Sequence, residues 1–146
     1  MKSNLTSIGF GGKLFIGDSS TCDEVNKIGA VYINVDENLN CAEIINNEHY
    51  DFKLPNPYAK DYGNNAKRTL KNAVEEAVCS LDQGKQVVIH SVNPELSIFV
   101  SACILFKCDS YDTFDDALYF VTKKRGSGKI HEKLIRAGQE TFNVIE

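Results

Sequence analysis

The sequence predicts an α/β domain in which a central, mostly parallel sheet is flanked by helices. Three short apolar runs, at 13–17, 30–35 and 86–89, have the composition of strands buried on both faces. From Ala66 onward, apolar residues recur at steps of three and four, which is typical of an amphipathic helix. Strands that alternate with helices favour a parallel sheet.

The chain has the length of one domain. With 146 residues it is long enough to bury about 70% of its unfolded surface. No repeat or linker interrupts it, so we expect an N-terminal segment at 1–11, the domain at 12–142 and a C-terminal tail at 143–146.

The order of the elements follows from periodicity and from turn residues. The first half predicts a strand at 13–17, a short helix at 18–26, a strand at 30–35, a polar surface excursion at 36–47, a strand at 49–54 and a loop at 55–65. The second half predicts a helix at 66–83, a strand at 86–89, a helix at 96–106 that is apolar on all sides, a helix at 113–125 and a last helix at 130–142. A helix that is apolar all round belongs in the centre of the domain.

The composition argues against several classes of partner. The net charge is −4 and no basic run is longer than Lys123 to Arg125, so we expect neither nucleic acid nor an anionic membrane to be bound. No apolar run suits a signal peptide or a membrane span. We therefore expect a soluble, cytoplasmic protein, with the nucleus left open.

The cysteine and histidine spacings predict no cofactor and no metal. Five cysteines form an odd set without C-x-x-C spacing, which argues against a disulfide framework and a zinc ribbon. The three histidines, His49, His90 and His131, show no ligand spacing. The cysteines are expected to be reduced thiols, several of them in the core.

The turn after the strand at 86–89 is the candidate functional site. In an α/β fold, the loop between the carboxyl end of a strand and the start of a helix offers unpaired N–H groups to an anion. The stretch from His90 to Ile98 resembles the signature loop of cysteine-dependent protein phosphatases, in which a His-Cys pair is followed after five residues by Arg, with a Gly between them. His90 matches this pattern, whereas Ser91 stands in place of the Cys, Pro94 of the Gly, Ser97 of the Arg and Ile98 of a Ser or Thr.

The rest of the chain resembles a dual-specificity phosphatase domain over residues 12 to 142. The stretches that carry the resemblance are Leu14–Gly17, Ile28–Val35, Tyr50–Pro55 and Thr113–Val121, with Arg125 following. The resemblance implies the fold of that family, a dual-specificity-phosphatase-like domain with a mostly parallel central sheet.

The resemblance also implies a mechanism for which this chain lacks the residues. That chemistry needs a thiolate nucleophile, an Arg that clamps two phosphoryl oxygens, a cradle of loop N–H groups and an Asp that protonates the leaving group. The hydroxyl of Ser91 is protonated at neutral pH, and Ser97 cannot replace a guanidinium. His90 is not expected to activate the Ser91 hydroxyl, because strand neighbours point to opposite faces. It is expected instead to be a buried structural imidazole bonded to backbone. Asp61 is the nearest remnant of the general acid, although the family's Asp would fall closer to Pro57.

The residues Asn93, Pro94 and Glu95 predict a loop that caps its own helix. Asn suits the N-cap, Pro the first helical position, and Glu the first turn, where a carboxylate is favoured. Pro94 also removes one N–H from the cradle. Our hypothesis is that Glu95 supplies, near the loop, the negative charge that a phosphate would have brought.

The sequence therefore predicts a pseudophosphatase that acts by protein–protein interaction. The expected partner is another protein, phosphorylated or not, and homodimerisation stays open. Candidate surfaces are 36–47 and 55–65, the latter with Tyr58 and Tyr62. One alternative is a phosphoprotein-binding module that uses the remnant loop, with Lys60 or Arg68 as the replacement cation. Another is a phosphatase with weak residual activity.

Overall fold

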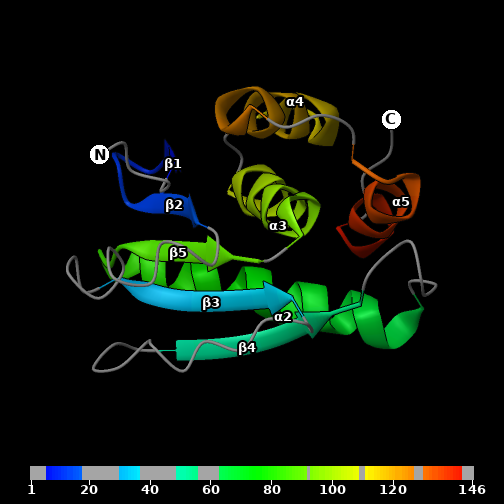
Figure 1. Ribbon diagram of the computed structural model, residues 1–146, viewed down its shortest axis with the longest axis horizontal. Coiled ribbons are helices and arrows are strands. Elements are labelled where there is room, and N and C mark those ends of the chain that lie inside the picture. The colour runs from blue at the N-terminus through cyan, green and yellow to red at the C-terminus, as the bar shows by residue number, and fades with distance from the viewer. Residues whose placement is uncertain are drawn as a thin grey trace.

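A computed structural model describes residues 6–17, 30–36, 49–55, 63–91, 93–108, 111–126 and 130–142. Its sheet has five strands, β1 (Thr6–Gly9), β2 (Leu14–Gly17), β3 (Val31–Asp36), β4 (His49–Leu54) and β5 (Val87–His90). Their order is β1-β2-β5-β3-β4. β1 is antiparallel to β2 and the other pairs are parallel. The predicted α/β fold with a mostly parallel sheet is confirmed (Figure 1).

The register of the parallel strands aligns their carboxyl ends. His90 of β5 pairs with Gly17 of β2 on one side and with Asn34 of β3 on the other. Asn34 in turn pairs with Asp51 of β4. Because parallel strands end at the same edge of a sheet, the loop after β5 begins beside the last residues of β2 and β3.

The edge strand β1 was not anticipated from the sequence. It lies within residues 1–11, which we expected to precede the domain, and it pairs with β2 through Thr6, Ser7 and Gly9. Its four residues contain a single large apolar side chain, Ile8, and this side chain is buried. A four-residue strand with one apolar residue shows no alternation, so periodicity could not reveal it.

Four helices are described, and each overlaps a predicted helical segment, although α2 begins inside the predicted loop at 55–65 and α3 extends beyond 96–106 at both ends. They are α2 (Asn64–Asp82), α3 (Pro94–Lys107), α4 (Phe114–Arg125) and α5 (Glu132–Thr141). The helix predicted at 18–26 lies outside the described residues. In the part of the chain that the structure describes, no helix combines the length and the apolar character needed to cross a membrane.

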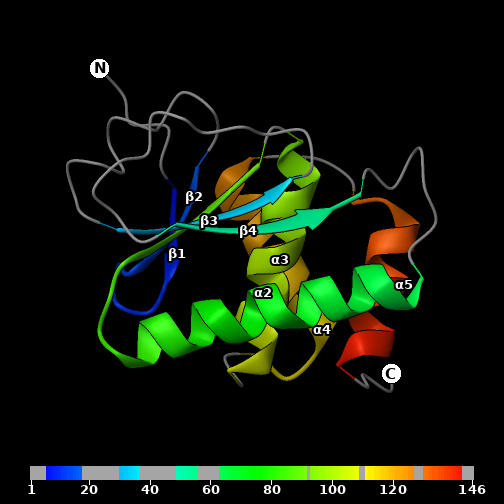
Figure 2. The ribbon, with the colours of Figure 1, turned by 90° about the horizontal axis from the view of Figure 1, so that it is seen from below.

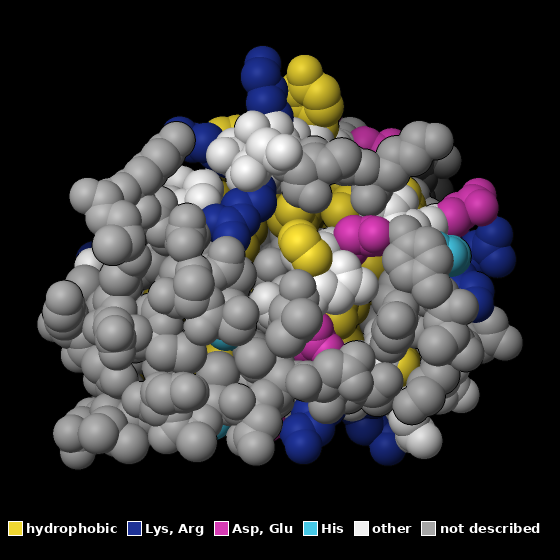
Figure 3. All heavy atoms as spheres, viewed as in Figure 1, with side chains coloured by type: hydrophobic (Ala, Val, Ile, Leu, Met, Phe, Trp, Pro, Cys, Tyr) yellow, Lys and Arg dark blue, Asp and Glu magenta, His cyan; other side chains and the backbone are white. Residues whose placement is uncertain are grey.

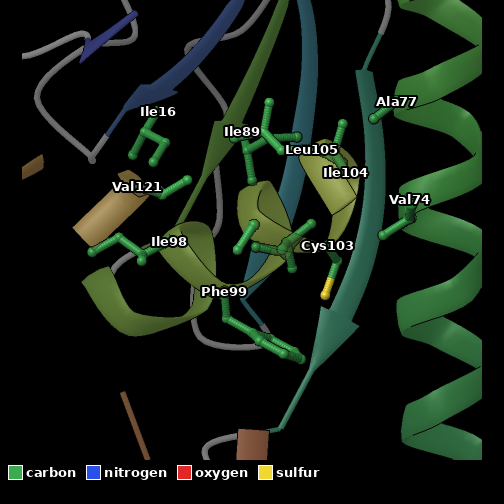
Figure 4. Close-up of a cluster of buried hydrophobic side chains, with 14 of the residues drawn as sticks. Ile16, Val74, Ala77, Ile89, Ile98, Phe99, Cys103, Ile104, Leu105 and Val121 are labelled. Carbon is green, nitrogen blue, oxygen red and sulfur yellow. The ribbon is translucent and has the colours of Figure 1, made fainter. Parts of the chain in front are cut away.

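Helix α3 forms the centre of the core. All residues from Leu96 to Leu105 are buried, as expected for a helix that is apolar on all sides. It lies between the sheet and α4 (Figure 1), and it also contacts α2 and α5. Side chains of α2, α3, α4 and the strands β2 and β5 meet around it (Figure 4).

Helix α5 approaches the core through a glycine. A Cβ atom built on Gly138 would lie 2.9 Å from Phe99 Cε1 and 2.9 Å from Phe114 Cζ. The two rings are themselves in edge-to-face contact, with centroids 6.2 Å apart. The absence of a side chain at Gly138 therefore lets α5 pack against the aromatic pair.

Replacing Ser101 by alanine is expected to raise the free energy of unfolding by about 1 kcal/mol. The Ser101 hydroxyl is fully buried in α3 and has no hydrogen-bond partner. An unpartnered buried hydroxyl costs about 1–3 kcal/mol, and alanine is also the better helix former. Urea unfolding measures the change. The matched control is Ser97→Ala, because the Ser97 hydroxyl donates to the Pro94 carbonyl at 3.2 Å. A gain no larger than that of the control would contradict the prediction.

The thiol of Cys103 is expected to resist alkylation while the exposed thiol of Cys79 reacts. Complete burial raises the pKa of the Cys103 thiol, so it stays protonated where an exposed thiol ionises. Mass spectrometry after brief treatment with iodoacetamide distinguishes the two sites, and the same treatment in urea should modify both. Modification of Cys103 at the rate of Cys79 in the folded protein would contradict this prediction.

The same burial predicts a pH dependence of stability. Because the folded state raises the pKa of Cys103, the folded protein holds this proton more tightly than the unfolded chain does. The contribution to the free energy of unfolding is constant below the pKa of the unfolded thiol and falls as the pH rises above it. A Cys103→Ala variant should lack this part of the decrease in the free energy of unfolding at alkaline pH.

Candidate functional site

The candidate site begins at His90, the last residue of β5. Its imidazole is completely buried, and Nδ1 lies 2.6 Å from the hydroxyl of Tyr32 on β3. The two rings are also in contact, with centroids 4.8 Å apart. We expected a backbone partner for this imidazole, and the partner found here is a side chain of the neighbouring strand. This pairing fixes the orientation of the ring within the sheet.

Ser91 makes its hydrogen bonds within the loop. Its hydroxyl donates to the carbonyl oxygen of Asn93 at 2.6 Å and accepts from the backbone N–H of Ser97 at 3.2 Å. The residue is 1% exposed. A nucleophile needs a base for its proton and an open path to its substrate. The hydroxyl proton of Ser91 is held instead by a backbone carbonyl in a buried position.

Four described N–H groups of the loop have acceptors inside the protein. The N–H of Asn93 donates to a carboxylate oxygen of Asp36 at 2.9 Å, and that of Glu95 donates to the side chain of Asn93 at 3.1 Å. The N–H of Leu96 donates to the carbonyl of Asn93, and that of Ser97 donates to Ser91. Pro94 has no N–H to offer. Val92 lies outside the described residues.

Asp36 belongs to the sheet and not to the polar surface excursion that we expected at 36–47. It is the last residue of β3 and is only 2% exposed. Its own N–H donates to the side chain of Asn34 at 3.0 Å, while its carboxylate accepts from Asn93. A buried carboxylate requires such partners. The negative charge beside the loop is therefore supplied by β3.

A row of polar side chains extends from Asn34 along the edge of the sheet. The amide of Asn34 donates to the Asp51 carboxylate at 2.9 Å, and the same carboxylate lies 3.2 Å from Nε2 of His49. Asn34 thus links the exposed pair on β4 to Asp36. The contact of this row with the loop is made by Asp36 of β3, which accepts the N–H of Asn93.

Glu95 reaches a different helix from the one in which it lies. One of its carboxylate oxygens accepts a hydrogen bond from the N–H of His131 at 2.9 Å. His131 is the N-cap of α5. We had assigned Glu95 to the anion position of the loop. This hydrogen bond places its carboxylate at the start of α5, where a helix dipole favours a negative charge.

Solved structures share this arrangement of sheet and helices. Human DUSP28 is 14% identical to this chain, with 97% of this chain and 94% of that chain covered and a TM-score of 0.79. A mouse putative dual specificity phosphatase complexed with zinc tungstate is 14% identical, with 97% and 87% covered and a TM-score of 0.80. The chain has the dual-specificity phosphatase fold. A human tyrosine phosphatase-like serine/threonine/tyrosine-interacting protein is 18% identical, with 95% of each chain covered and a TM-score of 0.73.

These likenesses establish the dual-specificity phosphatase fold. No protein-family model and no curated protein matches the sequence. Within this fold, the structure brings together four of the predicted loop positions, His90, Ser91, Pro94 and Ser97, together with the two capping residues Asn93 and Glu95.

The remaining predicted residues do not add to the described site of this fold. Asp61, the candidate remnant of the general acid, lies outside the described residues, as do Lys60, Tyr58 and Tyr62. Arg68 lies exposed on α2. Tyr32 and Asp36 were missed because their partners, His90 and Asn93, are 58 and 57 residues away along the chain. The one available signal was the polar Asp36 directly after an apolar strand, at the edge where the loop begins.

Proposed function

We propose that this chain is a pseudophosphatase, a non-catalytic protein of dual-specificity phosphatase fold that acts by binding another protein. The observation that carries the proposal is the use of the loop N–H groups. Those of Asn93, Glu95, Leu96 and Ser97 donate to acceptors of the protein itself. A phosphate-binding loop needs such groups for its ligand.

The side chains of the loop support the same proposal. Ser91 offers a buried hydroxyl whose proton is held by the Asn93 carbonyl. Ser97 is 2% exposed, and its hydroxyl donates to the Pro94 carbonyl. Because this hydroxyl is neutral, it provides no positive charge for a phosphate. Loss of a guanidinium removes two charge-assisted hydrogen bonds of about 1.5–3 kcal/mol each. The carboxylate of Asp36 beside the loop adds repulsion toward an incoming phosphate.

The proposal of a protein partner has two supports. A protein that has the fold of an enzyme but lacks the catalytic residues must act in another way. Protein binding requires no catalytic group. One structure of similar fold belongs to a protein that is itself named tyrosine phosphatase-like and interacting.

Two assays on one purified sample test the proposal. Hydrolysis of p-nitrophenyl phosphate is expected to be no faster than with a Ser91→Ala variant, while an active dual-specificity phosphatase serves as the positive control. Thermal shift with phosphate, sulfate or vanadate is expected to show no stabilisation through the loop. Turnover that Ser91→Ala abolishes would contradict the proposal. A saturable shift without turnover, mapped to the loop, would favour the phosphoprotein-binding alternative.

Restoring the nucleophile alone is expected to be insufficient. A Ser91→Cys variant should remain at the background rate, because the N–H groups of the loop are already used and no Arg stands at Ser97. Single-turnover assays with vanadate as inhibitor measure this. A vanadate-sensitive activity in Ser91→Cys would show that the loop can still bind a phosphoryl group.

A further inference from the structure

A polar pocket of about 510 Å³ lies between α2 and α5. Lys67 borders it from the first turns of α2. The other lining residues lie on α5 and its N-cap, and they are His131, Glu132, Lys133, Arg136, Ala137 and Glu140. Figure 2 shows one end of α2 lying beside α5, and the two helices are in contact. Pockets that bind small molecules fall in this size range.

The pocket is built on one face of α5. Its residues Lys133, Arg136, Ala137 and Glu140 follow the spacing of three, four and seven residues that aligns side chains on a helix. Ala137 is 2% exposed and forms the apolar floor. The ammonium of Lys67 is paired with the carboxylate of Glu140, so this pair joins the two helices at one end.

The formal charge of the pocket is opposite to that of the chain. Lys67, Lys133 and Arg136 give three positive charges, and Glu132 and Glu140 give two negative charges, so the lining carries +1. The whole chain carries −4. Figure 3 shows basic, acidic and histidine side chains next to one another over α5. One bound carboxylate would neutralise the lining, whereas a phosphate dianion would leave an excess of negative charge beside Glu132.

Arg136 is the cation best placed to meet that carboxylate. It is exposed, and it forms no ion pair with any residue in the described part of the chain. A guanidinium matches a carboxylate with two parallel hydrogen bonds. The start of α2 adds positive potential, since Gly63 provides no capping side chain and the first turn has no acidic residue.

His131 connects the pocket to the candidate site. Its N–H donates to Glu95, and its Nδ1 accepts from the N–H of Lys133 at 3.0 Å. A neutral ring with Nδ1 as acceptor carries its proton on Nε2. The pocket is therefore held in position by the helix that follows the degenerate loop.

We propose that the pocket between α2 and α5 binds an acidic segment of a partner protein, with Arg136 contacting an Asp or Glu carboxylate of that partner. The volume exceeds that of a single carboxylate, which favours a peptide segment over a lone ion. The inference rests on the proposed function, because it names the chemistry of the proposed partner.

Titration with three probe peptides tests the inference on the full chain. The probes are a capped hexapeptide rich in Asp and Glu, its Asn and Gln counterpart, and a phosphoserine counterpart. Calorimetry is expected to show binding of the acidic peptide, with amide chemical-shift changes in α5. Arg136→Gln should weaken binding about tenfold, whereas Arg68→Gln, an exposed cation of α2 outside the pocket, should change it less than twofold.

Three results would overturn the inference. One is equal binding of the Asn and Gln peptide, and another is equal loss in Arg136→Gln and Arg68→Gln. The third is tighter binding of the phosphoserine peptide at the same amides, which would assign the pocket to phosphoryl groups. Because none of these measures turnover or the loop, the pseudophosphatase proposal would still stand or fall on its own assays.

Discussion

Phe99→Ala is expected to lower the free energy of unfolding by about 3–5 kcal/mol. The ring is completely buried in α3 and packs edge-to-face on Phe114 of α4. It also lies at the glycine through which α5 approaches the core. Removing it leaves a cavity where three helices meet. Urea unfolding followed by circular dichroism measures the loss.

An exposed aromatic residue provides the matched control. Tyr119 on α4 is 68% exposed and lies within reach of Lys123, whose ammonium is 5.8 Å from the ring centroid. Tyr119→Ala is expected to cost less than about 1 kcal/mol, because only an exposed cation–π contact is lost. Similar costs for the two variants would mean that Phe99 is not at the centre of the core.

Asp36→Ala is expected to lower the free energy of unfolding by about 1.5–3 kcal/mol, the range for hydrogen bonds to charged groups. The carboxylate accepts the N–H of Asn93, which is the N-cap of α3. Without it, a part-buried N–H loses its acceptor at the start of the central helix. Thermal and urea unfolding both report the change.

Asp36→Asn separates the hydrogen bond from the charge. The amide oxygen of Asn can still accept from Asn93, so this variant should lose less stability than Asp36→Ala. If both variants were as stable as the wild type, the loop would not depend on β3 for its conformation.

Local sequence patterns predicted the elements in which many successive residues follow one hydrophobic pattern. Helix α2 and the buried helix α3 followed from periodicity, and Asn93, Pro94 and Glu95 marked the start of α3. The fold followed from the order of these elements and from a resemblance that the solved structures confirm at the level of fold.

Long-range partners could not be predicted in the same way. The hydrogen bond between His90 and Tyr32 joins β5 to β3, and that between Asn93 and Asp36 joins the N-cap of α3 to β3; both join residues that are far apart in sequence. The direction of the Glu95 side chain depends on where α5 begins relative to α3, which no local pattern encodes. The strand β1 is held by pairing with β2 and has too few residues for a pattern.

The central proposal is that four described N–H groups of the loop, those of Asn93, Glu95, Leu96 and Ser97, donate within the protein and are therefore not available to a phosphate. The most direct measurement is a ¹⁵N–¹H correlation spectrum recorded during titration with inorganic phosphate and with vanadate. We expect the amide resonances of Asn93, Glu95, Leu96 and Ser97 not to move. Saturable shifts of these four resonances would contradict it and show that the loop still binds an anion.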